Sequence, residues 1–327
     1  MVSNLKNLLR TIAAIFFPRP IFLFHKPTAR CDCRCHFCDF WQNQPDRDDV
    51  LPTPEILSFL NQAKSAGFTT YILWGGEPLL VKDLPIWLKY TKTIGMETMF
   101  CTSGNYLSER AETVGPFTDR LILSIEAIGA KHDEIRGYPG LFNRVVEGLK
   151  RFKNVSDAQV IIWSHINRDN KNEVAGIARF AQQFKVKVEF FPTTRYSGYN
   201  EGMILNTQER ETVFENVREL KRRGYPVNNT WYALDLMKSG RSFRCNIPLL
   251  SIQVYPDGLI YPCEKRVIPD LKPYGHINEI DLKKLFTSEV FQKESRRLLQ
   301  CNNCLLPCVA HLADDLPIQG VRRVFGV

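Results

Sequence analysis

The segment "TPEILSFLNQAKSAGFTTYILW" (53–74) joins an amphipathic helical pattern to a short apolar run, which indicates a helix followed by a strand. Thr53, before Pro54 and Glu55, is typical of a helix N-cap, and Gly67 is typical of a C-cap. Such units recur over residues 20–192, where six apolar runs are expected to be strands: "PIFLFH" (20–25), "TTYILW" (69–74), "ETMFCT" (97–102), "RLILSI" (120–125), "QVIIWS" (159–164) and "VKVEFF" (186–191). The alternation predicts parallel strands with right-handed helical crossovers, and therefore an α/β fold with a partial (β/α)6 TIM-type barrel.

The pattern changes after residue 228, beyond a helical stretch at about 208–224. The segment "LSIQVYPDGLIYPC" (250–263) predicts a β-hairpin that turns at Pro256-Asp257-Gly258. We therefore expect three parts: an N-terminal amphipathic helix (1–19), the barrel (20–228) and a small C-terminal α+β domain made of a β-hairpin plus helix (229–327).

The composition excludes a disordered chain, because 327 residues that are 44% hydrophobic can bury a large core. Lys and Arg are spread along the chain despite a net charge of +8, so no nucleic-acid partner is expected. The apolar N-terminal run is too short to span a bilayer and is interrupted by Pro18 and Pro20, which predicts a cytoplasmic protein. Residues 1–17 follow helical spacing, and this helix either packs on the barrel, which we favour, or touches a membrane surface.

Four cysteines lie within "CDCRCHFC" (31–38), directly after the first expected strand. Active-site residues of a parallel barrel gather on the loops that follow the strands, so this loop shares one rim with "GGEP" (75–78), "SGN" (103–105) and "SIEAIGAKHDEIRG" (124–137). Ten cysteines in two distant groups favour metal binding over disulfides. Closely spaced thiolates on one loop can hold three corners of a four-iron cluster.

The CxxxCxxC spacing of Cys31, Cys35 and Cys38, together with "GGEP" after the second strand, resembles the radical S-adenosylmethionine (radical SAM) superfamily. The resemblance implies that these three cysteines bind a [4Fe–4S] cluster whose open iron takes the amino and carboxylate groups of S-adenosylmethionine. It also implies a set of cofactor-binding residues: Gly75, Gly76 and Glu77 for the methionine amino group, Phe37 near the adenine, Ser103 and Asn105 for the ribose, Ser124 at the end of the fourth strand, and Arg136 for the methionine carboxylate. Asn167 and Asn170 are weaker matches on the same rim.

Two cysteines outside this motif receive structural interpretations. Cys33 is expected to be a bystander thiol that the crowded loop leaves exposed, and Cys101 a small buried hydrophobe in a strand.

As an alternative to an iron–sulfur cluster, the two CxxC pairs, at 35–38 and 301–304, could form a structural zinc site. The coincidence of CxxxCxxC, "GGEP" and alternating strands disfavours zinc, because a zinc site requires none of the three.

The second cysteine group resembles the auxiliary iron–sulfur extensions called SPASM and, in shortened form, twitch domains. The resemblance implies one fully ligated auxiliary [4Fe–4S] cluster on Cys245, Cys263, Cys301 and Cys304, with Cys308 as a substitute ligand. Such a cluster can accept an electron from a product radical and complete an oxidation. Alternatively, the cluster only stabilises the fold of a small domain.

These features together predict a radical SAM oxidoreductase that cleaves S-adenosylmethionine to a 5′-deoxyadenosyl radical and abstracts hydrogen from an unknown small molecule, cofactor or peptide. A one-electron reductant of the flavodoxin or ferredoxin type is the implied partner. Arg195, Tyr196 and Tyr199, after the sixth strand, either bind substrate at the mouth of the active site or are ordinary loop residues, which we favour. Two alternatives remain open: a membrane-associated member of the superfamily that acts on a lipid or isoprenoid, and a non-catalytic zinc or iron–sulfur protein.

Overall fold

The computed structural model describes all residues except 1–12, 15, 17–18, 44–49, 197 and 307–327. Its strands form one sheet in the order β6-β5-β4-β3-β2-β1-β7-β8-β9. The strands are β1 (Phe22–His25), β2 (Thr70–Leu73), β3 (Glu97–Thr102), β4 (Arg120–Ser124), β5 (Gln159–Ile166), β6 (Lys187–Pro192), β7 (Ser251–Val254), β8 (Leu259–Tyr261) and β9 (Gly275–His276). The six expected barrel strands are confirmed, each within two residues at either end.

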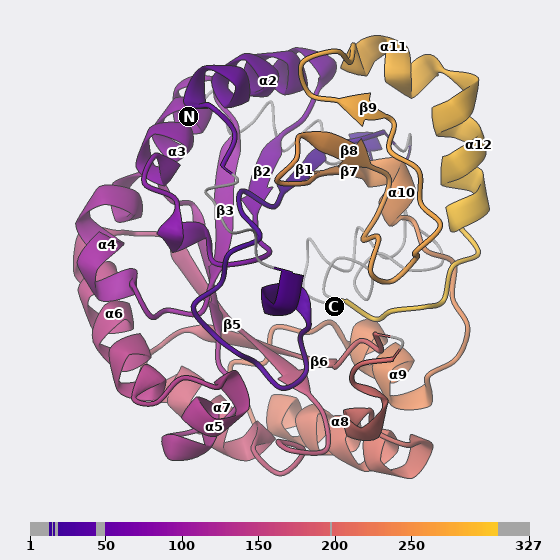
Figure 1. Cartoon of the computed structure of the whole chain (residues 1–327). Coiled ribbons are helices and arrows are strands. Elements are labelled where there is room, and N and C mark those ends of the chain that lie inside the picture. The colour runs from indigo at the N-terminus through magenta and orange to yellow at the C-terminus, as the bar shows by residue number, and fades with distance from the viewer. Residues whose placement is uncertain (1–12, 15, 17–18, 44–49, 197, 307–327) are drawn as a thin grey trace.

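Strands β1 to β6 are parallel and curve into a partial barrel that does not close, with the helices on its outer face (Figure 1). The α-helices are α2 (Thr53–Ala66), α3 (Leu84–Thr93), α4 (Leu107–Val114), α5 (Ala130–Arg136), α6 (Leu141–Val155), α7 (Val174–Gln183), α8 (Thr207–Arg222), α9 (Trp231–Ser239), α10 (Ile247–Leu250), α11 (Leu282–Thr287) and α12 (Glu289–Leu298). Short 3-10 helices lie at η1 (Phe40–Asn43), η2 (Pro78–Leu80), η3 (Gly115–Phe117) and η4 (Glu201–Met203). Helices and strands alternate as predicted because each amphipathic helix buries its apolar face on the sheet.

Helix α2 differs from the prediction at its first residue. Thr53 is not the N-cap: the helix starts at Thr53, and its hydroxyl donates to the Asp83 carboxylate (2.5 Å) and accepts from the Trp87 indole (2.9 Å). The hydroxyl therefore joins α2 to α3 instead of capping its own helix. Gly67 is confirmed as the C-cap, because it adopts a φ of 109°.

The C-terminal segment continues the same sheet. Strand β7 pairs in parallel with β1, with Gln253 opposite Phe24, and β8 pairs antiparallel with β7. The predicted hairpin is therefore confirmed, and Gly258 provides the positive φ of 77° at its turn. This continuity places the second cysteine group beside the open edge of the barrel, while the boundary at residue 228 stays a prediction.

The predicted N-terminal helix lies mostly outside the described residues. Where it is described, Ala14 is buried and Phe16 is 55% exposed. Across the described part of the chain, no helix has the length and apolar character needed to cross a membrane.

Candidate functional site

The loop with the first cysteine group lies against the C-terminal end of α5. The backbone N–H groups of Arg34 and His36 donate to the carbonyl oxygens of Arg136 (2.9 Å) and Ile135 (3.0 Å). A Cβ at Gly137 would lie 2.5 Å from the Arg34 carbonyl oxygen, so the close approach requires glycine. The backbone of the barrel therefore sets the shape of this loop.

The four thiols of the loop line one wall of a cavity. Cys33 and Cys35 are buried, whereas Cys31 and Cys38 are half-buried. The expectation that Cys33 is exposed is wrong, because the loop turns its side chain inward and 0% of its surface is accessible. Hydrogen bonds with Cys31 and Cys35 hold the pKa of the Cys33 thiol well below its ordinary value. Cys33 therefore lies among the predicted cluster ligands.

The "GGEP" turn follows β2 and lies against the chain that enters the cysteine loop. Gly76 has a φ of 56°, and a Cβ there would lie 2.5 Å from the carbonyl oxygens of both Thr28 and Arg30. Gly75 has a φ of 72°, and a Cβ there would lie 2.6 Å from the Lys26 side chain. Gly76 is required because the turn brings two backbones into contact, and Gly75 because a side chain there would collide with Lys26 at a positive φ.

The Glu77 carboxylate is buried below this turn, with 1% of its surface exposed. It accepts hydrogen bonds from the Leu79 N–H (2.9 Å), the Thr102 hydroxyl (2.8 Å) and the Ser103 N–H (2.7 Å). Burial raises the pKa of Glu77 to about 7, against the effect of these donors. Since a carboxylate offers about four acceptor positions, one remains for a ligand such as an ammonium group.

Arg136 ends α5 and lines the cavity beside the cysteines. Its Nη1 lies 3.4 Å from Oε1 of the fully buried Glu126, and its Nε is buried without a hydrogen-bond partner. Burial lowers the pKa of Arg136, but Cys35, Cys33 and Glu126 outweigh burial and raise it above its ordinary value. A permanently charged guanidinium with a free N–H suits an anionic ligand group.

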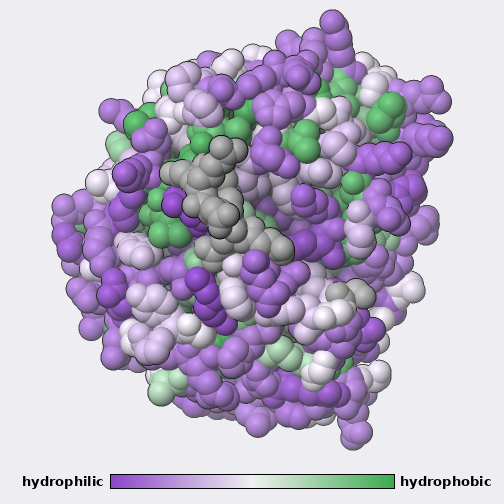
Figure 2. Space-filling model, viewed as in Figure 1, coloured by the Kyte–Doolittle hydropathy of each residue, from purple (hydrophilic) through white to green (hydrophobic). Residues whose placement is uncertain are grey.

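One cavity, part of it open to solvent, brings most of the predicted residues together. Its lining includes Cys31, Cys35, Phe37, Cys38, Gly75, Gly76, Glu77, Ser103, Ser124, Arg136, Cys263 and Cys304. Figure 2 shows apolar side chains in separate small patches, mostly in the upper half of the view, on a surface that is otherwise largely hydrophilic. Because the cavity lining includes cysteines of both groups, a ligand in the cavity would lie near both.

Several predicted residues lie elsewhere. Asn105 does not line the cavity; its amide donates to Asp32 Oδ2 at 2.6 Å. Asn170 donates to the Glu126 carbonyl oxygen at 2.9 Å, which is a structural role. Arg195 is exposed and is not among the residues that line the cavity, whereas Tyr196 lines it.

Cys101 is also placed differently from the expectation. It is half-buried and lines the cavity. The alternation along β3 explains this position, because the neighbouring residues Phe100 and Thr102 are buried whereas Cys101 is not. Cys308 lies outside the described residues.

The second cysteine group comes from three separate segments. Cys245 precedes α10, Cys263 follows β8, and Cys301 and Cys304 follow α12. None of the four forms a disulfide. Burial raises the pKa of the Cys263 thiol, and the charges of Cys304 and Cys301 raise it further. Burial raises the pKa of Cys304 to about 12. The sheet and α12 therefore bring the predicted auxiliary ligands into one neighbourhood.

Among the described residues, no three His, Cys, Asp or Glu side chains are arranged around a point that could hold a single metal ion. A four-iron cluster makes a different demand, because its thiolate ligands bind separate iron atoms at the corners of a cube. Soft thiolates facing a shared cavity are the donor set that such clusters take.

Sequence reasoning missed several residues of the cavity wall: Trp74, Trp163, Gln253, Glu264 and Arg266. Trp74 had a signal, since it ends the second strand directly before "GGEP". Arg266 and Gln253 had none, because the C-terminal segment reaches the cavity only through the pairing of β7 with β1.

Comparisons with known proteins agree with this arrangement. Residues 26–181 match the model of the radical SAM superfamily, and residues 245–305 match that of the SPASM iron–sulfur cluster-binding domain. The chain is 24% identical over 220 residues to the Fe-coproporphyrin III synthase of Methanosarcina barkeri, covering 64% of this chain and 54% of that protein. It is 27% identical over 165 residues to a probable GTP 3′,8-cyclase of Saccharolobus solfataricus, covering 49% and 52%.

The chain thus spans about half the length of these curated relatives. Among solved structures, SuiB of Streptococcus suis bound to S-adenosylmethionine superposes with a TM-score of 0.69 at 18% identity. That superposition covers 85% of this chain and 68% of SuiB, and it supports the fold.

Proposed function

We propose that this chain, which belongs to the radical SAM superfamily and carries a SPASM domain, reductively cleaves S-adenosylmethionine and oxidises a small, largely apolar substrate. The observation that carries the proposal is the shared cavity. Cysteines of both groups, Glu77 and Arg136 all line it. A substrate in this cavity would lie within reach of both predicted clusters.

In this proposal Cys31, Cys35 and Cys38 hold a [4Fe–4S] cluster, which supplies with S-adenosylmethionine a 5′-deoxyadenosyl radical. Glu77 accepts the methionine ammonium group at its free acceptor position, and Arg136 pairs with the methionine carboxylate. The tight turn at Gly76 lets "GGEP" lie directly against the chain that enters the cysteine loop. These residues orient the cofactor and keep it in a largely buried place.

The second group would hold the auxiliary [4Fe–4S] cluster. Loss of a hydrogen atom removes one electron from the substrate, and an oxidation needs a site for a second electron and release of a proton. Cys245, Cys263, Cys301 and Cys304 provide that site in our proposal, which is why we favour an oxidoreductase. An external one-electron donor of the flavodoxin or ferredoxin type would supply the reducing electron.

The substrate class follows from the cavity wall between the two groups. It is lined by Phe24, Ile72, Trp74 and Trp163, with the amide of Gln253 among them. Of the two arginines of the described wall, Arg136 is assigned to the methionine carboxylate in this proposal, and Arg266 is paired with Asp39. Such a wall favours an apolar molecule with few polar groups over a nucleoside triphosphate like the one in the name of the cyclase relative.

The test is anaerobic reconstitution of the full chain, followed by chemical reduction in the presence of S-adenosylmethionine. We expect 5′-deoxyadenosine by mass spectrometry in the wild type and none above background in Cys35→Ala. The proposal fails if the wild type forms none, or if both proteins form it equally. A colourless, zinc-loaded wild type after anaerobic purification would favour the non-catalytic alternative.

A second candidate is a peripheral membrane enzyme that acts on a lipid or isoprenoid from the cytoplasmic side. The exposed Phe16 and the apolar cavity favour it. Flotation with liposomes that is lost on deleting residues 1–17 would support this candidate, and equal flotation of both proteins would oppose it.

A further inference from the structure

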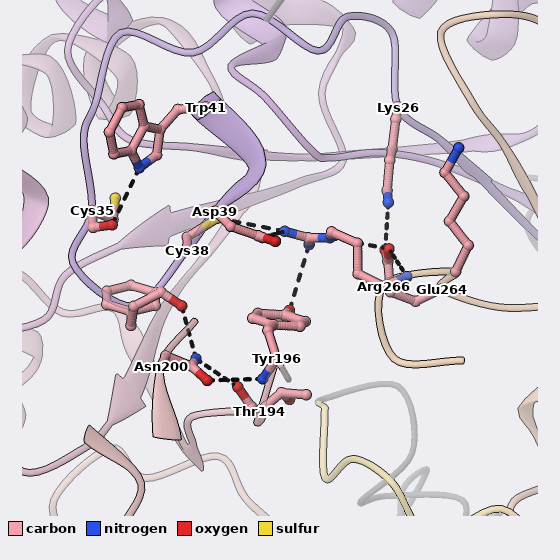
Figure 3. Close-up of polar contacts among 12 residues, drawn as sticks. Lys26, Cys35, Cys38, Asp39, Trp41, Thr194, Tyr196, Asn200, Glu264 and Arg266 are labelled. Atoms are coloured by element: carbon pink, nitrogen blue, oxygen red, sulfur yellow. Dashed lines mark hydrogen bonds and ion pairs between the residues drawn. The ribbon is translucent and has the colours of Figure 1, made fainter. Parts of the chain in front are cut away.

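We propose that Arg266 is a positioning residue that ties the auxiliary segment to the first cysteine loop and raises the reduction potential of the cluster held there. Figure 3 shows the contacts that lead to this inference. It rests on the proposed function, because it requires a cluster on Cys31, Cys35 and Cys38.

The Arg266 guanidinium contacts the loop directly. Its Nη1 lies 3.0 Å from Asp39 Oδ1 and 3.6 Å from Cys38 Sγ. The guanidinium also lies over the rings of Phe40, at 4.9 Å, and Tyr196, at 4.6 Å. An arginine side chain from the C-terminal segment thus meets a predicted cluster ligand, the residue after it and the helix η1 that follows (Figure 3).

The other side of Arg266 is held by Glu264. The Arg266 Nε donates to Glu264 Oε1 at 3.2 Å, and the Tyr255 hydroxyl donates to the same oxygen at 2.8 Å. Lys26, at the end of β1, is fully buried and forms an ion pair with Oε2 of Glu264. The Arg266 backbone N–H also donates to Oε1, at 3.2 Å. The Glu264 carboxylate, itself 1% exposed, therefore accepts from four donors and holds Arg266 in place.

The charges in this network balance. Lys26 and Arg266 are cations, and Glu264 and Asp39 are anions, so the network can be buried without a net charge. Arginine suits the place because its planar fork of donors reaches Glu264, Asp39 and Cys38 from one group, which the single ammonium of a lysine does not do. Glu264 directly follows Cys263, so the same contacts link a ligand of each predicted cluster.

The expected effect on the cluster follows from electrostatics. Hydrogen bonds to the sulfur ligands, net charge and solvent exposure set the potential of an iron–sulfur cluster. An N–H donor with a positive charge beside Cys38 Sγ stabilises the extra electron of the reduced state more than it stabilises the oxidised state. Removing it should make the first cluster harder to reduce.

The experiment is a redox titration of the anaerobically reconstituted full chain, followed by electron paramagnetic resonance. The first cluster is identified as the one whose spectrum changes on adding S-adenosylmethionine. We expect a more negative midpoint potential in Arg266→Gln and a smaller shift in Arg266→Lys. The matched control is Lys265→Gln: the Lys265 ammonium lies over Tyr255, at 4.6 Å from the ring centroid, and carries the neighbouring charge. We expect no shift there.

Asp39→Asn keeps the proposal testable if the arginine variants fold poorly. Removing the negative charge beside Cys38 should shift the midpoint in the opposite, positive direction. Unchanged midpoints in Arg266→Lys and Asp39→Asn, with the cluster intact, would overturn the inference and leave the proposed function standing. A wild type with no cluster that responds to S-adenosylmethionine would instead overturn the proposed function.

Discussion

The two cysteine groups of this protein are built in opposite ways. The first places four cysteines on one loop, from 31 to 38, whose backbone is held by the C-terminal end of α5. The second gathers four cysteines from three separate segments between 245 and 304. In the first group the barrel determines where the thiols lie. In the second group the segments already contact one another, since the Cys245 N–H donates to the Leu299 carbonyl oxygen at 2.9 Å and the Phe243 N–H donates to Asn302 Oδ1 at 2.6 Å. A bound cluster would add four thiolate links to these contacts.

The largest expected effect is the difference in local stability when one cysteine is removed from each group. Cys263→Ala should loosen residues 245–304, because metal ligation contributes to the folding of the segments it joins, on the order of 10 kcal/mol for structural zinc in small peptides. Cys35→Ala should leave the fold intact, since the loop keeps its hydrogen bonds to α5. Limited proteolysis of the anaerobically reconstituted proteins, read by mass spectrometry, should show cleavage in residues 245–304 of Cys263→Ala only.

Cys101→Ala serves as the control for loss of a thiol from the cavity wall, and it should resist the protease like the wild type. Equal resistance of Cys263→Ala and Cys35→Ala to the protease would show that the two groups do not differ in this way. The second group would then be held by its packing alone, as the first is.

The next largest effect concerns the close backbone contact at Gly76, which we expect to shape the binding site for S-adenosylmethionine. Gly76→Ala would force a Cβ to 2.5 Å from two carbonyl oxygens at a φ of 56°, so the turn must move. The positive φ alone costs about 1–2 kcal/mol. We expect the affinity for S-adenosylmethionine, measured by equilibrium dialysis of the reconstituted protein, to fall at least about tenfold, equivalent to 1.4 kcal/mol.

Gly140→Ala is the matched control, because Gly140 also has a positive φ, of 79°, but a Cβ there meets nothing within 4 Å. It should lose stability through backbone strain and keep its affinity. If both variants bind S-adenosylmethionine like the wild type, the tight turn at "GGEP" plays no part in the site.

The comparison also explains how much the sequence could predict. The barrel strands follow from local alternation of apolar and helical patterns, and the rim position of the first loop follows from the fold, so both were predicted well. The inward turn of Cys33 was not, because the loop takes its shape from the close approach of Gly137, a residue far along the chain. The role of Arg266 could not be predicted from the sequence, since its contact with Cys38 joins residues 228 positions apart.

The smallest effect concerns the extra thiol of the first group. Cys33 is fully buried beside Cys31 and Cys35, yet the CxxxCxxC spacing assigns it no iron. Cys33→Ala should therefore keep the iron content and the formation of 5′-deoxyadenosine, and lose about 1 kcal/mol of folding stability from the small space it leaves.

Cys33→Ser sharpens this last test, because it keeps the size and a hydrogen-bonding group while removing the sulfur. If Cys33→Ser retains activity but Cys33→Ala does not, the side chain orients its neighbours through its hydrogen bonds. If the iron content of both variants falls by the equivalent of one cluster, Cys33 is a ligand. The first group, like the second, would then use all four of its thiols.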